Sequence, residues 1–124
     1  MKSNSYRLWD IHNNKYLTYQ DTIRKRIFLS ITGEVIQISK KTNTVNDVTS
    51  LYLVRDNTGI KDLDNKYVYH KDIVDCFISG LSVVCYRNGS FGLFDEHGFF
   101  MTFNLLGGKI KVVGNLDETP HLLD

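Results

Sequence analysis

The chain has 124 residues, of which 42% are hydrophobic, and its formal net charge is +1. This length fits one domain or two small lobes with a shared core, and the composition is that of a globular protein rather than a disordered one. No apolar run approaches the ~20 residues of a membrane-spanning helix and no secretory signal precedes Trp9, so we expect a cytoplasmic protein with no membrane partner.

Residues 1–56 are predicted to form an N-terminal β lobe. Short runs rich in Ile, Val, Phe and Tyr are separated by Gly, Asn and Asp, and no window of a dozen residues has a helical stripe. The clearest hairpin joins Arg26–Ile31 to Val35–Ile38 through a two-residue Gly33-Glu34 turn. That turn would pair Ile31 with Ile36 and Leu29 with Ile38. The polar residues near 39–46 are expected to form an exposed loop.

Residues 57–124 contain enough short strands to close a small antiparallel barrel and hide its edges. The expected strands are Ile73–Ile78, Ser82–Arg87, Ser90–Phe94, Gly98–Phe103 and Lys109–Val113. Asn88-Gly89 predicts a type I′ turn between the second and third, because both residues tolerate a positive φ.

The strand from Gly98 to Phe103 is expected to return from an Asp95-Glu96-His97-Gly98 turn, with Phe94 paired to Phe99 and Gly92 to Met101. The glycine pair Gly107-Gly108 would then break the meander before the last strand.

The tail from Gly114 to Leu123 is predicted to be ordered. A disordered tail should be polar, whereas this one carries Leu116, Leu122 and Leu123 around Pro120. It would dock either on its own barrel or on a second copy of the chain.

Three short segments, one near each end of the chain and one at its middle, carry a family resemblance. They are Tyr6-Arg7-Leu8-Trp9-Asp10, then Thr58-Gly59-Ile60-Lys61-Asp62-Leu63-Asp64-Asn65-Lys66 leading to Asp72-Ile73-Val74, and Val113-Gly114-Asn115-Leu116 with Pro120 and Leu122-Leu123. These segments resemble the YopX family of small proteins encoded by bacteriophages and prophages.

The resemblance implies a mainly β protein of phage origin, located in the bacterial host cell, whose C-terminal half is an SH3-like barrel and whose biochemical role is unassigned. One departure from the family pattern affects the backbone. Lys71 stands where the family has glycine before Asp-Ile-Val, which disfavours a positive-φ bend at that position.

No motif for catalysis, phosphate cradling or dinucleotide binding is present, so we expect a protein that is not an enzyme, with no catalytic residues and no cofactor. No metal site is expected either, since the histidines are scattered and the two cysteines do not form a C-x-x-C pair. A hairpin centred between Gly80 and Leu81 would place Cys76 opposite Cys85. We expect both to be reduced thiols that pack as small hydrophobic groups.

The concentrated positive patch consists of Arg24, Lys25 and Arg26, with Lys40 and Lys41 beyond the first hairpin. These side chains could contact nucleic-acid phosphates, with Tyr16, Tyr19 and Phe28 nearby to stack bases. The simpler interpretation is a solvated edge strand whose charges deter edge pairing. Charge also divides along the chain: residues 1–62 carry ten Lys/Arg and six Asp/Glu, and residues 63–124 carry five and eight, so the two ends could attract each other or another copy.

Tyr6, Trp9, Tyr16 and Tyr19 are interpreted first as cross-strand packing partners and second as candidates for an interaction surface. The leading functional hypothesis is a non-enzymatic phage or prophage accessory protein that binds an unknown protein partner or forms a homo-oligomer. The alternative is a nucleic-acid-binding module that uses the basic first hairpin.

Overall fold

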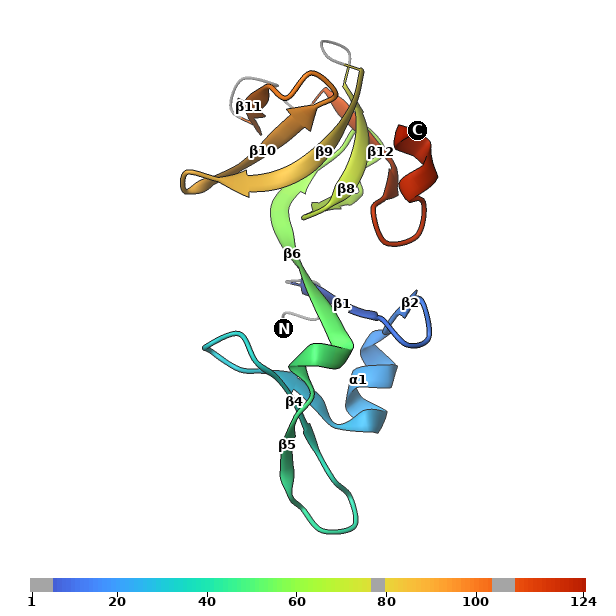
Figure 1. Ribbon diagram of the computed structural model, residues 1–124, viewed down its shortest axis with the longest axis vertical. Helices are drawn as coiled ribbons and strands as arrows, with labels where there is room; N and C mark the ends of the chain where they lie inside the picture. The colour runs from blue at the N-terminus through green and yellow to red at the C-terminus, as the bar shows by residue number, and fades with distance from the viewer. Residues whose placement is uncertain (1–5, 77–79, 104–108) are drawn as a thin grey trace. The chain divides into compact units, whose positions relative to one another are not determined.

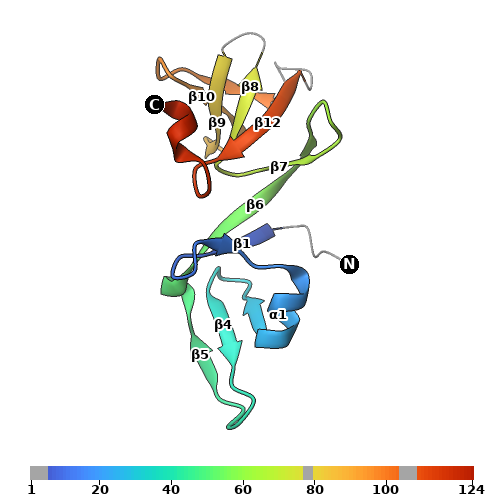
Figure 2. The ribbon, with the colours of Figure 1, turned by 90° about the vertical axis from the view of Figure 1, so that its right-hand side faces the viewer.

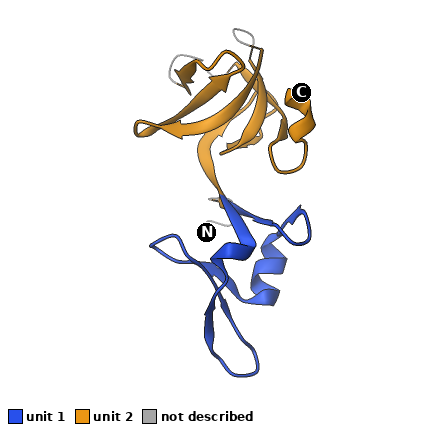
Figure 3. Cartoon of the chain, viewed as in Figure 1, with its two compact units in different colours: residues 1–3, 7–54 blue, residues 4–6, 55–124 orange. Residues whose placement is uncertain are grey.

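The structure is a computed structural model that describes residues 6–76, 80–103 and 109–124 (Figures 1 and 2). As predicted, the protein is mainly β. The chain forms two compact units (Figure 3). Unit 1 contains residues 7–54, and unit 2 contains Tyr6 and residues 55–124. Strand β6 (Tyr52–Lys61) begins in the first and ends in the second. No helix of the described residues is long and apolar enough to cross a membrane.

Unit 1 combines a three-stranded sheet, a short helix and the strands β1 and β2, which belong to a sheet in the order β2-β1-β6-β7. The elements are β1 (Tyr6–Asp10), β2 (Lys15–Tyr16), α1 (Tyr19–Lys25), β3 (Ile27–Leu29), β4 (Val35–Ile38), β5 (Val45–Asp47) and the 3-10 turn η1 (Thr49–Leu51). The three-stranded sheet has the order β3-β4-β5, and β2 pairs with β1. The buried apolar side chains of unit 1 are Leu8, Trp9, Leu17, Ile27 and Val35.

Helix α1 was not predicted from the sequence. The Thr18 hydroxyl accepts a hydrogen bond from the Asp21 N–H at 3.1 Å, and the Asp21 carboxylate accepts one from the Thr18 N–H at 3.0 Å. This capping box starts a helix of seven residues, which is too short to show a helical stripe. Arg26 then ends it in a left-handed conformation with φ 54°, so the expected strand from Arg26 begins one residue later.

The first hairpin is present, but its predicted register is wrong. Phe28 lies opposite Ile36 and Leu29 opposite Val35, so neither Ile31–Ile36 nor Leu29–Ile38 forms a pair. The loop is longer than two residues because Ser30 and Glu34 close it: the Ser30 N–H donates to the Glu34 carbonyl at 2.8 Å. Ile31 therefore lies in the loop and is fully exposed.

Unit 2 is built around an antiparallel sheet in the order β11-β10-β9-β8-β12. The bounds are β8 (Asp72–Cys76), β9 (Gly80–Arg87), β10 (Ser90–Asp95), β11 (Phe100–Thr102) and β12 (Ile110–Asn115), with β7 (Tyr67–Tyr69) paired to β6 and the 3-10 turn η3 (Pro120–Leu123) at the end. A core cluster fills one side of this sheet: Val68, Val74, Cys76, Val84, Leu93, Phe103 and Ile110.

The Asn88-Gly89 turn is confirmed, with φ 52° and 85° at its two residues and Arg87 opposite Ser90. The next pairing is displaced by one residue from the prediction: Phe94 lies opposite Phe100 instead of Phe99. The Asp95 carboxylate causes this, since it accepts hydrogen bonds from the N–H groups of His97 and Phe99 and holds Phe99 within the turn.

The last strand also differs from the prediction, because β12 extends to Asn115 through a bulge between Val112 and Gly114. The predicted C-terminal end of the strand Ile73–Ile78 and the predicted Gly107-Gly108 break lie outside the described residues.

The expected pairing of the two cysteines is wrong. Cys76 lies opposite Gly80, and Cys85 lies opposite Gly92 on the other neighbouring strand. Strand β9 pairs with β8 in a register different from the hairpin centred between Gly80 and Leu81. Both cysteines are free; Cys76 is buried and Cys85 is half-buried.

The tail is ordered and packs on unit 2. The Leu116 N–H donates to the Lys71 carbonyl at 3.0 Å, and η3 contacts β12. Leu116 and Leu122 are half-buried, as expected for a docked tail. The expected burial of Leu123 is wrong, since 42% of this side chain is exposed.

Candidate functional site

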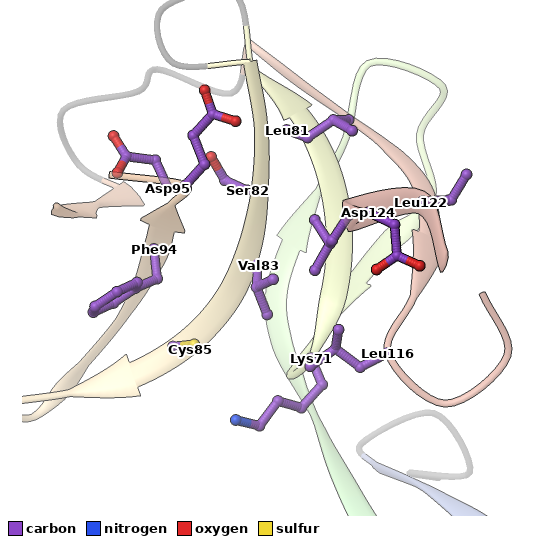
Figure 4. Close-up of a pocket in the computed structure, with 12 residues that line it drawn as sticks. Lys71, Leu81, Ser82, Val83, Cys85, Phe94, Asp95, Leu116, Leu122 and Asp124 are labelled. Carbon is purple, nitrogen blue, oxygen red and sulfur yellow. The ribbon is translucent and has the colours of Figure 1, made fainter. Parts of the chain in front are cut away.

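A groove of about 520 Å³ crosses the outer face of the unit 2 sheet (Figure 4). We call it the β9 groove. It is lined by Lys71, Leu81, Ser82, Val83, Cys85, Phe94, Asp95, Glu96, Leu116, Leu122, Leu123 and Asp124.

The floor of the β9 groove is apolar because side chains alternate along β9. Ser82 and Val84 point into unit 2 and are buried, which turns Leu81, Val83 and Cys85 outward. Phe94 lies opposite Val83 and therefore shares the same face of the sheet. Figure 4 shows Val83 between Leu81 and Cys85 along the strand.

The tail forms one wall of the groove with Leu116, Leu122 and Leu123. Its position depends on a glycine: a Cβ added at Gly114 would clash with the Thr119 hydroxyl and lie 2.6 Å from Leu122 Cδ1. The close approach of η3 to β12 therefore requires Gly114.

Charged groups stand at the edges of the groove. Lys71 lies at one end, and Asp95, Glu96 and Asp124 supply three carboxyl groups. The Lys71 backbone has φ 71°, so the positive-φ bend that lysine was expected to disfavour is present. Hydrogen bonds on both sides fix the conformation: the Lys71 N–H donates to the Val84 carbonyl at 2.8 Å, and the Lys71 carbonyl accepts from Leu116. A lysine is thus held in a conformation that favours glycine, at the edge of the groove.

The floor of the β9 groove offers an apolar contact surface. The outward groups of the floor are alkyl, aromatic and thiol groups. Within residues 6–76, 80–103 and 109–124, no three metal-ligating side chains come together. The alternation Leu81-x-Val83-x-Cys85 could have indicated the floor from sequence, whereas the wall comes from leucines 31 to 42 positions further along.

Four of the five basic candidates come together in unit 1. Arg24, Lys25, Lys40 and Lys41 line a concave surface of about 480 Å³, together with Gln37, Ile38, Ser39 and Asn46. Arg26 does not line it and instead donates to the Asn43 side-chain oxygen at 3.5 Å. Residues 24 and 25 lie in the last turn of α1, so the interpretation of an edge strand is wrong for them.

The four aromatic candidates differ in burial and in the contacts they make. Trp9 is buried and meets Tyr16 edge to face at 4.8 Å between ring centroids, and the Arg7 guanidinium lies 4.2 Å from the Tyr16 ring centroid. Tyr6 is half-buried in β1 and Tyr19 is half-exposed at the start of α1. Trp9 and Tyr16 thus pack against each other.

Comparison with known proteins identifies the family of the chain. The family model described as YopX protein matches residues 5–124, so the chain belongs to the YopX family. Two solved structures share the fold, both with a TM-score of 0.60. Protein EF1440 from Enterococcus faecalis is 21% identical, with 97% of each chain covered. The yopX protein from Bacillus subtilis is 17% identical, with 98% of this chain and 99% of that chain covered. No curated protein sequence matches the chain.

Proposed function

We propose that this member of the YopX family is a non-enzymatic protein-interaction module that binds a segment of a partner protein in the β9 groove. Its setting is that of a phage or prophage accessory protein in the cytoplasm of a bacterial host, as the family resemblance implies.

The observation that carries this proposal is an apolar floor bordered by charged side chains. Protein interfaces have this anatomy, with a desolvated apolar centre and a polar rim. Leu81, Val83 and Phe94 offer the centre, and Lys71 and Glu96 belong to the rim. The groove volume lies in the range of specific binding sites and is large enough for a few side chains.

The charges of the rim indicate the chemistry of the partner. Three carboxyl groups and one ammonium group give the groove a negative balance. A complementary segment carries apolar side chains next to Lys or Arg, because electrostatic complementarity selects such partners.

A library of displayed random peptides tests the proposal. Peptides are selected on the wild-type protein, and their affinities are then measured by fluorescence polarisation for wild type, Leu81→Lys and Leu63→Lys. Leu81 is 38% exposed in the groove, and Leu63 is 55% exposed elsewhere on unit 2, so Leu63→Lys is the matched control. We expect enriched peptides with apolar and basic residues, and a loss of about tenfold or more in affinity for Leu81→Lys alone, equivalent to 1.4 kcal/mol.

The outcomes show whether the β9 groove binds a segment of a separate partner protein or a second copy of the chain. Enriched peptides that bind Leu81→Lys as tightly as wild type, or no enrichment at all, would contradict the groove as the binding site. If the protein self-associates and Leu81→Lys makes it monomeric in light scattering, the groove holds a second copy and the proposal of a separate partner is wrong.

We also propose that unit 2 is an SH3-like barrel. This is supported by the five short antiparallel strands in the order β11-β10-β9-β8-β12 and by the bulge that bends β12.

A further inference from the structure

We propose that unit 1 binds the phosphate backbone of nucleic acids, independently of the β9 groove. The site is the concave surface lined by Arg24, Lys25, Lys40 and Lys41, which we call the basic concavity.

Three elements build the basic concavity. The last turn of α1 supplies Arg24 and Lys25, β4 supplies Gln37 and Ile38, and the loop after β4 supplies Lys40 and Lys41. Figure 1 labels α1 and β4. The Gln37 amide donates to the Lys25 carbonyl at 3.0 Å and so ties β4 to the end of the helix. Charges about fifteen residues apart in sequence are thereby placed around one hollow.

These positive charges are only partly neutralised. Arg24 pairs with Asp21 at 2.8 Å, although 64% of the arginine side chain is exposed. Within the described parts of the chain, Lys25, Lys40 and Lys41 form no ion pair. Residues 1–54 carry eight Lys/Arg and four Asp/Glu, so the surroundings are also positive. Like charges that converge on a hollow repel one another, and an anionic ligand relieves that repulsion.

The lining indicates what kind of anion fits. A volume of about 480 Å³ is larger than one phosphate group needs, and Ser39 and Asn46 add neutral hydrogen-bond donors. A nucleic-acid strand offers one negative charge per nucleotide at regular spacing, which suits several cations at once.

The same lining argues against readout of bases. It contains Ile38 as its apolar side chain and no aromatic ring on which a base could stack. Tyr16, which the sequence analysis offered for stacking, is covered by Arg7 and Trp9. Contacts to phosphates position a protein without reading sequence. Binding is therefore expected to be independent of sequence and strongly dependent on salt.

Fluorescence anisotropy with a labelled oligo(dT) strand of about 20 nucleotides, a duplex of equal length and an RNA strand tests this site. If all four cations meet phosphates, log Kobs falls with log salt with a slope of about −3 on single strands and about −4 on duplex. The double variant Lys40→Gln/Lys41→Gln should make that slope less negative by about 1.5 and should weaken binding at low salt about tenfold or more. Comparison of the three probes shows which nucleic acid binds most tightly.

The matched control is Lys66→Gln/Lys109→Gln, which removes the same charge from exposed positions of unit 2. It should retain wild-type affinity and slope, and circular dichroism checks that both variants are folded. Leu81→Lys should also bind nucleic acid normally, so the failure of this proposal and that of the groove are distinguishable.

Several results would overturn the proposal. One is the absence of binding to all three probes at low salt, and another is an equal loss of affinity in the control variant. Tighter binding to polyglutamate or to vesicles with anionic lipids than to any nucleic acid would show that the basic concavity serves a different polyanion.

Discussion

The Arg55 guanidinium donates two hydrogen bonds to the Asp117 carboxylate, from Nε to Oδ2 at 3.0 Å and from Nη2 to Oδ1 at 2.8 Å. The side chains are 14% and 5% exposed, so the pair is largely withdrawn from water. It joins β6 to the tail across 62 positions of sequence. The wall of the β9 groove is thus anchored by a bidentate ion pair at its base.

Breaking this ion pair should destabilise unit 2. Asp117→Ala leaves a mostly buried guanidinium without its carboxylate, and we expect the free energy of unfolding to fall by about 3 kcal/mol. Asp64→Ala, which removes the exposed Lys111–Asp64 pair at 3.9 Å, should change it by less than about 1 kcal/mol. Urea denaturation measures both. Similar losses in the two variants would contradict a special role for Arg55–Asp117.

The approach of the tail to β12 depends on Gly114. Gly114→Ala places a methyl group against Thr119 and Leu122, and relieving such overpacking by movement of η3 should cost about 1–3 kcal/mol. Alkylation of the half-buried Cys85 in the groove should become faster as the wall moves away, while Cys76 stays protected. A variant with wild-type stability and unchanged Cys85 reactivity would show that the tail does not need this contact.

Local signals in the sequence predicted those parts of the fold that local geometry decides. Asn88-Gly89 determines its turn because both residues accept a positive φ, and the register of β9 with β10 follows directly. The helix α1 also had a local signal, Thr18-x-x-Asp21, but periodicity over a dozen residues cannot detect a helix of seven.

The pairing of β8 with β9 was not predictable in the same way. The symmetry of Cys76 and Cys85 about Gly80-Leu81 suggested that these two residues pair. The observed register pairs Cys76 with Gly80 and buries Val74, Cys76 and Val84 in the core. Register depends on which side chains the rest of the unit covers, which a local pattern does not contain.

The two candidate sites differ in how far sequence could predict them. The basic candidates are close in sequence or joined by one hairpin, so four of the five come together. The β9 groove has a wall from the tail and a floor from β9, and its existence depends on Gly114 and on the anchor at Asp117.

The Asn88-Gly89 turn depends on glycine at its second position. Gly89 has φ 85° with open space around it, so a bulky residue is disfavoured there by the backbone alone. Gly89→Val should lower the free energy of unfolding by about 1–3 kcal/mol. Gly89→Asn should lower it less, because asparagine tolerates a left-handed backbone. Thermal unfolding compares them, and equal melting temperatures for wild type and Gly89→Val would refute the argument.

Lys71 places a positive charge at the groove, but its left-handed backbone is expected to lower the free energy of unfolding. A residue with a Cβ in the left-handed region costs roughly 1–2 kcal/mol, partly offset by the greater flexibility of glycine in the unfolded chain. Lys71→Gly should therefore raise the free energy of unfolding by up to about 1 kcal/mol. Lys71→Val should lower it by a similar amount or more. A loss of stability in Lys71→Gly would mean that the lysine side chain itself stabilises the fold.

Asp62 should make stability depend on acid. Its side chain is buried at 7% exposure, and burial alone would raise the pKa of this carboxyl. Hydrogen bonds from the N–H groups of Val112, Lys66 and Asp64, each at 2.9 Å, outweigh burial and hold the pKa of Asp62 below the ordinary aspartate value of 3.8. A lowered folded pKa means that the unfolded chain binds the proton first.

The stabilisation by the Asp62 carboxylate is thus fully present above pH ~4 and is lost as the pH falls below that value toward the folded pKa. Asp62→Asn removes the charge and leaves one acceptor oxygen, since the amide nitrogen cannot accept from the N–H groups that the two carboxylate oxygens bind. It should therefore lower the free energy of unfolding at pH 7 by about 1.5–3 kcal/mol. The exposed neighbour provides the control: Asp64→Asn should change it by less than about 1 kcal/mol. Urea denaturation at pH 7 and pH 3 should show the difference between wild type and Asp62→Asn shrinking in acid, because protonation weakens the same hydrogen bonds in the wild type. A difference that stays constant between the two pH values would mean that the carboxylate charge contributes nothing to holding β12 against the turn at Asp62.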